Sequence, residues 1–171
     1  GRLLCPDFVG NGVSDWSLSR IYCDSYAGWL PGKTLRLANY SDETGQSFRY
    51  YISPFFGGNP PTAINSETET VLRLNVPEGS PSNDIVALII ATRGSLDSRN
   101  ADGDNYFFDG SSNDPQDNDL IVPITRSELM AATESRIANE LRLCLEKYPN
   151  DSKNLEKSYP WPAPLANNTF K

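Results

Sequence analysis

Histidine is absent from the 171-residue chain, which has only three cysteines and one methionine. The commonest general base and zinc ligand is therefore missing, and none of the cysteines forms a CxxC pair. A phosphate-cradling glycine loop and a G-x-S-x-G motif are missing as well. These absences argue against a zinc site and against the common hydrolases, so we expect no enzymatic activity. The one catalytic alternative is a pair of aspartates that hydrolyses a glycosidic bond.

The sequence also lacks any run approaching ~20 apolar residues, which a membrane helix would need. Its net charge of −7 argues against binding nucleic acid or anionic membranes. Thirteen prolines and twelve glycines predict many turns, while 38% hydrophobic residues exclude wholesale disorder. The length fits one domain, or one domain with an appendage. A start at Gly1, without an initiating methionine or a signal peptide, is expected of a mature or trimmed protein.

The longest apolar run is Asp84–Thr92, in which β-branched residues dominate. With a proline before it and a glycine after it, this run predicts a strand that is buried on both faces. A polar stretch with seven aspartates follows, from Asp97 to Asp119, and Leu120–Val122 is apolar again. Two short strands therefore flank a long acidic loop, and long ordered loops are where binding sites tend to lie.

The remaining elements predict an α+β fold, a small antiparallel sheet packed against a long helix with large loops. Residues 47–53 have strand composition, and the alternation over 70–76 predicts an edge strand. Thr125 and Glu128 form a capping box that starts a helix ending before Pro149. Apolar residues recur along it at helical spacing, and we expect Leu141 to face the sheet. The chain thus divides into a globular region, 1–124, and a helix with a proline-rich tail, 125–171.

Two of the three cysteines, Cys5 and Cys23, lie in the turn-rich front portion, whereas Cys144 lies on the apolar stripe of the predicted helix. The alternatives are three buried thiols or one disulfide, and a disulfide would indicate an oxidising compartment. If one forms, we expect it to join Cys5 and Cys23.

Several scattered motifs resemble a known family. They are Gly1-Arg2-Leu3-Leu4-Cys5-Pro6-Asp7, then Gly28-Trp29-Leu30-Pro31 with Thr34-Leu35, then Asp42 and Gly45 leading into Phe48-Arg49-Tyr50. Over residues 1–125 this series is similar to type IV pilin-like proteins, in particular the pseudopilins of type II secretion. Leu4 departs from the family's proline, Gly32 and Thr44 depart from its tryptophans, and the prepilin start with its first helix is absent.

The resemblance implies a pilin-like subunit of a cell-surface or periplasmic filament or secretion apparatus in the bacterial envelope. Its partners would be other pilin-like subunits or secretion-system proteins, with membrane attachment through the absent N-terminal helix and no nucleic acid. The rival interpretation is a free secreted binding module, for example one that binds carbohydrate. Residues 125–171 also parallel the family's own beginning, so they either start a second pilin-like unit or form an ordinary C-terminal helix and tail.

The acidic loop is the candidate metal site. Alternating carboxylates and amides suit Ca²⁺, which takes six to eight hard oxygen ligands. The expected ligands are Asn100, Asp102, Asp104 and Asp119, although an EF-hand pattern fails because Asn105 stands where glycine is needed. The family resemblance also implies calcium, which some pseudopilins bind in a late loop. The alternative is a solvated acidic loop with Asx turns.

Overall fold

The structure is a computed structural model that describes residues 2–17, 22–58, 63–75, 82–101, 103–110, 119–155 and 157. It divides into two compact units, Gly1–Met130 and Ala131–Lys171. In chain order its elements are β1 (Ala27–Trp29), β2 (Arg49–Ile52), the 3₁₀ helix η1 (Pro54–Phe56), β3 (Leu72–Asn75), β4 (Ser82–Ala91), α1 (Ser98–Ala101), β5 (Tyr106–Phe108), β6 (Leu120–Thr125), α2 (Arg126–Lys147) and η2 (Tyr148–Asn150). In the described part of the chain, no helix combines the length and apolar character that a bilayer crossing requires.

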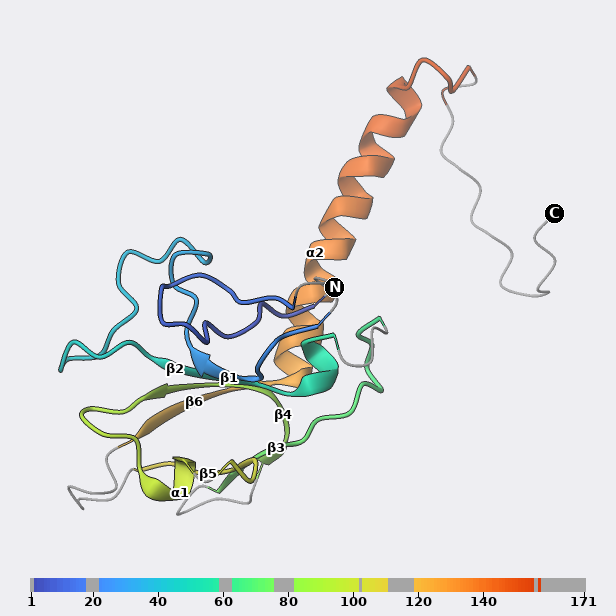
Figure 1. Cartoon of the computed structure of the whole chain (residues 1–171). Helices are drawn as coiled ribbons and strands as arrows, with labels where there is room; N and C mark the ends of the chain where they lie inside the picture. Colours follow the sequence, from blue (N-terminus) through green and yellow to red (C-terminus); the bar gives the residue numbers. More distant parts are fainter. Residues whose placement is uncertain are drawn as a thin grey trace. The chain divides into compact units, whose positions relative to one another are not determined.

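Strand β4 is the centre of a six-stranded sheet with the order β1-β2-β4-β3-β5, and β6 also pairs with β4 (Figure 1). It pairs antiparallel with β2 along Ala87–Ile90 and with β6 along Ile85–Ala91. Its first half pairs antiparallel with β3, across a register shift. The ten-residue strand therefore pairs directly with β2, β3 and β6, and β2 and β3 connect it to β1 and β5.

Both faces of β4 are covered, as its composition predicts. Val86 and Ala87 belong to a first core cluster with Ile52, Phe56 and the two cysteines of the front portion. Ile85, Leu88 and Ile90 belong to a second core cluster with Leu72, Leu74, Phe107 and Ile121. All five of these β4 side chains are 0% exposed. The first cluster takes its other buried members from residues 5–56, and the second takes them from β3, β5 and β6. Phe107 packs edge-on against Tyr51, with the ring centroids 4.7 Å apart.

The expectation of α+β is confirmed at that coarse level, but two details of the predicted sheet are wrong. The sheet is mixed, because β3 pairs parallel with β5. Strand β3 is also not an edge strand, since β4 lies on one side of it and β5 on the other. Strand β5 was not predicted from the sequence, because its residues, Tyr106–Phe108, are only a short apolar run among the aspartates of the acidic stretch.

The first turn of α2 is tied to the sheet. Thr125 and Glu128 form the predicted capping box: the Thr125 amide donates to Glu128 Oε2 (2.9 Å), and the Glu128 amide donates to Thr125 Oγ1 (3.3 Å). Arg126 bridges to Asp84 at 2.8 Å, and Leu129 packs against the first core cluster. The helix therefore begins at the capping box, as the sequence predicts.

Beyond Met130 the helix belongs to the second unit, and the apolar side chains of the expected face are exposed there. That Leu141 faces the sheet stays a prediction. Leu141 is 57% exposed, Ile137 is 54% exposed, and no residue of α2 is buried. Within the second unit the helix carries two ion pairs at i,i+4 spacing, Arg136–Glu140 (3.7 Å) and Arg142–Glu146 (2.7 Å). Helical spacing of apolar residues identified the helix correctly, but spacing alone does not say whether anything covers the apolar side.

Candidate functional site

A disulfide joins Cys5 and Cys23, which are 0% and 3% exposed, and Cys144 is free and exposed. The pairing is the one expected from the sequence. It fixes the N-terminal segment against the first core cluster, where the Leu3 amide also donates to the carbonyl of Phe56 (3.0 Å). Gly57 must be glycine here, because a Cβ would lie 2.8 Å from Ile52 and 3.0 Å from the Cys23 sulfur.

Asp7 organises the loop that follows this segment. Its carboxylate is buried and accepts hydrogen bonds from the amides of Gly10 (2.6 Å), Asn11 (3.1 Å) and Gly12 (2.5 Å). Both glycines have positive φ, +81° and +85°, which lets the backbone wrap around the carboxylate. The sequence analysis missed this role, although an aspartate followed by glycines at the third and fifth positions was a usable signal.

A second aspartate closes the same loop from its far end. One carboxylate oxygen of Asp15 accepts hydrogen bonds from the amides of Phe8 (2.7 Å) and Val9 (3.0 Å). Ser14 beside it donates to the carbonyl of Cys5 (2.9 Å). Five backbone amides between residues 8 and 12 are thus held by two carboxylates, so the loop has a defined conformation.

The motifs that carry the family resemblance meet around Asp7. Asp7 and Trp29 exchange two backbone hydrogen bonds of 2.9 and 2.8 Å, and Leu30 donates to Phe48 (2.8 Å). A Cβ on Gly28 would lie 2.6 Å from the carbonyl oxygen of Asp7, so this close approach requires glycine. The Arg49 guanidinium lies over the Trp29 ring, 4.4 Å from its centroid. Segments separated by about twenty residues each are therefore joined in one hydrogen-bonded cluster.

The Asp42 turn belongs to the same region. Its carboxylate accepts hydrogen bonds from the amides of Thr44 (2.9 Å), Gln46 (3.0 Å) and Arg93 (2.9 Å), and from the Thr44 hydroxyl (2.6 Å). Chiefly through the Thr44 hydroxyl, these donors lower the pKa of Asp42 below its usual value. The turn therefore holds the end of β4 beside β2. Because its pKa is lowered, the Asp42 carboxylate is a weaker base than an ordinary aspartate.

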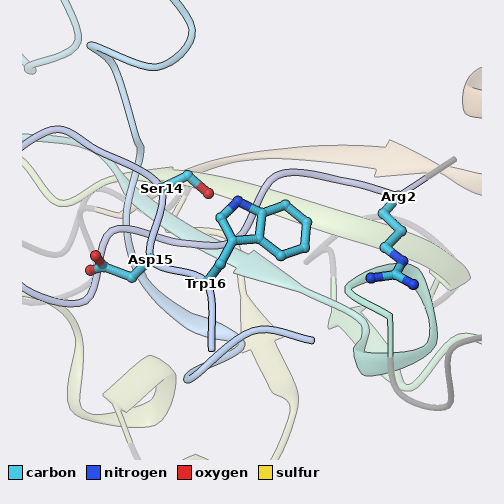
Figure 2. A pocket seen from close by; sticks show the side chains of 4 residues that line it. All are labelled: Arg2, Ser14, Asp15 and Trp16. Atoms are coloured by element: carbon cyan, nitrogen blue, oxygen red, sulfur yellow. The ribbon is translucent and has the colours of Figure 1, made fainter. Parts of the chain in front are cut away.

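An open cavity of about 470 Å³ lies beside the first loop and is lined by Arg2, Ser14, Asp15 and Trp16. Figure 2 shows the Trp16 indole between Arg2 on one side and Ser14 and Asp15 on the other. A smaller cavity of about 230 Å³ is lined by Asp7, Gly10, Asn11, Gly12, Trp29, Lys33, Tyr40 and Ser47. No motif in the sequence indicates either cavity.

The structure brings together two of the four expected calcium ligands. The Asn100 amide donates to Asp119 Oδ2 (2.8 Å), and both residues are buried. Asn100 also donates to the carbonyl of Phe108 (3.1 Å) and accepts from its amide (2.7 Å). Asp119 Oδ2 accepts from the Asp97 amide as well (3.0 Å). These groups tie the base of the acidic loop to β5 and β6.

The other two expected ligands lie elsewhere. Asp104 is exposed, and its Oδ1 accepts from the Tyr106 amide (2.8 Å), which is the geometry of an Asx turn. Asp102 lies outside the described residues. Among the described residues, no group of three or more histidine, cysteine or acidic side chains is placed to hold a metal. Calcium binding therefore stays a prediction.

Two tyrosines of β2, buried Tyr50 and partly buried Tyr51, complete the electrostatics of the sheet. Burial raises the pKa of Tyr50 far above its usual value. Burial also raises the pKa of Tyr51, with a further contribution from the charge of Asp119 and an opposing one from Arg49. Both phenols are therefore protonated at physiological pH and do not act as bases.

Comparisons of this chain with protein-family models, with curated proteins and with solved structures found no match.

Proposed function

We propose that the chain is a pilin-like subunit that acts through protein–protein assembly in the bacterial envelope, without chemistry of its own. The observation that carries the proposal is the cluster around Asp7. The segments Cys5-Pro6-Asp7, Gly28-Trp29-Leu30-Pro31 and Asp42–Phe48 resemble pilin-like proteins only as scattered motifs in sequence. In the fold they are joined by the Asp7–Trp29 and Leu30–Phe48 backbone hydrogen bonds, so they form one structural unit.

The exposed apolar side chains support an assembly role. Val122 on β6 and Leu141 on α2 are 53% and 57% exposed. Single exposed apolar side chains are ordinary on protein surfaces. Larger groups of exposed apolar side chains often mark a surface where a partner binds. Periplasmic or extracellular placement agrees with the Cys5–Cys23 disulfide, because disulfides persist in oxidising compartments.

Crosslinking in cells tests the proposal. A photoreactive amino acid at Val122 or Leu141 of the full-length gene product should give crosslinked species at multiples of the subunit mass or to another envelope protein. The same amino acid at exposed Asp24 serves as the matched control. The proposal also requires a prepilin-type helix of ~20 apolar residues encoded ahead of residue 1. Monomer alone at both positions, in cells whose filaments or secretion survive deletion of the gene, would refute it.

The second candidate is a secreted carbohydrate-binding module, and the cavity at Trp16 is the observation that favours it. An indole face with a carboxylate, a hydroxyl and a guanidinium around it can stack on a sugar ring and bind its hydroxyls. Titration with oligosaccharides, followed by tryptophan fluorescence, should then give saturation that Trp16→Ala abolishes. Saturable sugar binding without crosslinked assemblies would favour this candidate over the pilin-like one.

A further inference from the structure

Two neighbouring loops carry the most exposed cluster of large apolar side chains in the described part of the first unit. The two-loop surface consists of residues 8–13 and 32–37. Its apolar members are Phe8 (62% exposed), Val9 (71%), Val13 (45%), Leu35 (43%) and Leu37 (43%). None of these five side chains lines either of the two cavities described above, and each is at least 43% exposed.

Hydrogen bonds join the two loops into one surface. The carbonyl of Gly12 accepts from the amides of Lys33 (2.8 Å) and Thr34 (3.3 Å), and Thr34 Oγ1 accepts from the Ser14 amide (3.0 Å). Lys33 Nζ donates to the carbonyl of Asn11 (2.5 Å). The loops lie side by side in Figure 1. With Asp7 and Asp15 holding residues 8–12 from below, the apolar side chains are presented by a fixed backbone, and binding needs little further ordering.

The charge of this surface is opposite to that of the whole chain. The segments 8–13 and 32–37 contain two charged residues, Lys33 and Arg36, and both are exposed. The two nearest carboxylates in sequence, Asp7 and Asp15, are turned toward backbone amides. The exposed charged side chains of the two-loop surface itself are therefore both positive.

From this geometry we propose that the two-loop surface docks on a phospholipid bilayer that contains anionic lipids. Phe8, Val9 and the leucines would enter the interface between headgroups and acyl chains, while Lys33 and Arg36 would meet the lipid phosphates. Interfacial binding grows with the apolar area buried and with attraction to anionic lipid. A fluid bilayer accommodates protruding side chains without a complementary pocket, whereas a folded protein partner would have to supply one.

Vesicle sedimentation tests the proposal with the chain itself. The protein should bind vesicles of phosphatidylcholine with phosphatidylglycerol, and added salt should weaken the binding. Replacing Phe8 and Val9 together with serine should lower the partition coefficient roughly tenfold on these vesicles. Arg36→Glu should lower it roughly tenfold on them as well, and should have little effect on vesicles of phosphatidylcholine alone. All three positions are exposed, and thermal melting checks that each variant stays folded.

Leu155→Ser is the matched control, because Leu155 is 91% exposed but lies in the second unit; its partition coefficient should be unchanged. A second readout places a polarity-sensitive dye on Val9→Cys in a Cys144→Ser background, and its emission should shift to the blue on anionic vesicles only. Absence of binding to the vesicles that contain phosphatidylglycerol would overturn the proposal. So would equal losses for Leu155→Ser, or a two-loop surface that binds only a protein partner and leaves the dye unchanged on lipid.

Discussion

At the scale of single residues, the fold depends on carboxylates that accept backbone amides. Asp7, Asp15, Asp42 and Asp119 each bind two or more backbone or side-chain donors. Such side chains act locally as substitutes for secondary structure, because they satisfy the amides of loops that have no ladder or helix partner. This explains how a chain with short strands and long loops has defined backbone in its front portion.

Asp7→Asn should therefore destabilise the protein. The asparagine would turn an NH₂ group toward one of the amides that Asp7 now accepts, leaving a buried donor without its acceptor. We expect a loss of about 1–3 kcal/mol in the free energy of unfolding, measured in urea. Asp24→Asn, at an exposed position, is the control and should change little. Equal midpoints for the two variants would contradict the role given to Asp7.

Replacing Cys5 and Cys23 with serine should lower the stability by roughly 3 kcal/mol, because the bridge closes a loop with a sequence separation of 18. Peptide mass mapping without reductant should show the Cys5–Cys23 pair, and Cys144→Ser should leave the urea midpoint nearly unchanged. A linkage that involves Cys144, or a double mutant as stable as the parent, would count against the pairing.

At the scale of the elements, the capping box makes a prediction about pH. The amide and the hydroxyl of Thr125 both donate to Glu128, and they lower the pKa of Glu128 below its usual 4.5. A lowered pKa means that ionised Glu128 supports the helix start above pH 4.5, and that this support is lost as the pH falls through the lowered value. Thr125→Ala should return the pKa of Glu128 toward 4.5 in an NMR titration, and an unchanged pKa would contradict the box.

One buried and one exposed leucine give a matched pair of substitutions. Leu88 on β4 is 0% exposed and Leu141 on α2 is 57% exposed. Leu88→Ala should cost about 2–5 kcal/mol, because it leaves a cavity in the second core cluster. Leu141→Ala should cost within about 0.5 kcal/mol in urea denaturation. A large loss in the free energy of unfolding for Leu141→Ala would instead support the prediction from the sequence that Leu141 packs against the sheet.

An element could be predicted from the sequence when the residues that specify it lie close together in the chain. The run at β4, the composition of β2 and the box at Thr125 specify their structures within a few residues. Strand β5 could not be found this way, because three residues among aspartates become a strand only through the parallel pairing with β3. The role of Asp7 was missed although its signal is local, an aspartate followed by glycines three and five positions later. The pairing of Asn100 with Asp119, across nineteen positions, has no periodic signal.

At the scale of the whole molecule, the acidic loop is the feature that solution conditions should affect most. Seven aspartates lie between residues 97 and 119, and a divalent cation would relieve their mutual repulsion. If Ca²⁺ binds the native state, stability should rise by about 2.7 kcal/mol at a hundredfold excess over Kd. Melting with millimolar Ca²⁺ and then with a chelator measures this. An unchanged midpoint, with no heat in a Ca²⁺ titration of stripped protein, would leave the loop as a solvated acidic segment.

Strand β4 pairs with β2 and β3, which precede it in the chain, and with β6, which follows it by about thirty residues. A ribosome therefore releases the most apolar strand well before β6 exists. During that interval the nascent chain offers an open, hydrophobic edge that other strands can join. Slow translation through residues 92–119 should lengthen the exposure, so yield in a cell should depend on codon choice and chaperone supply over this stretch.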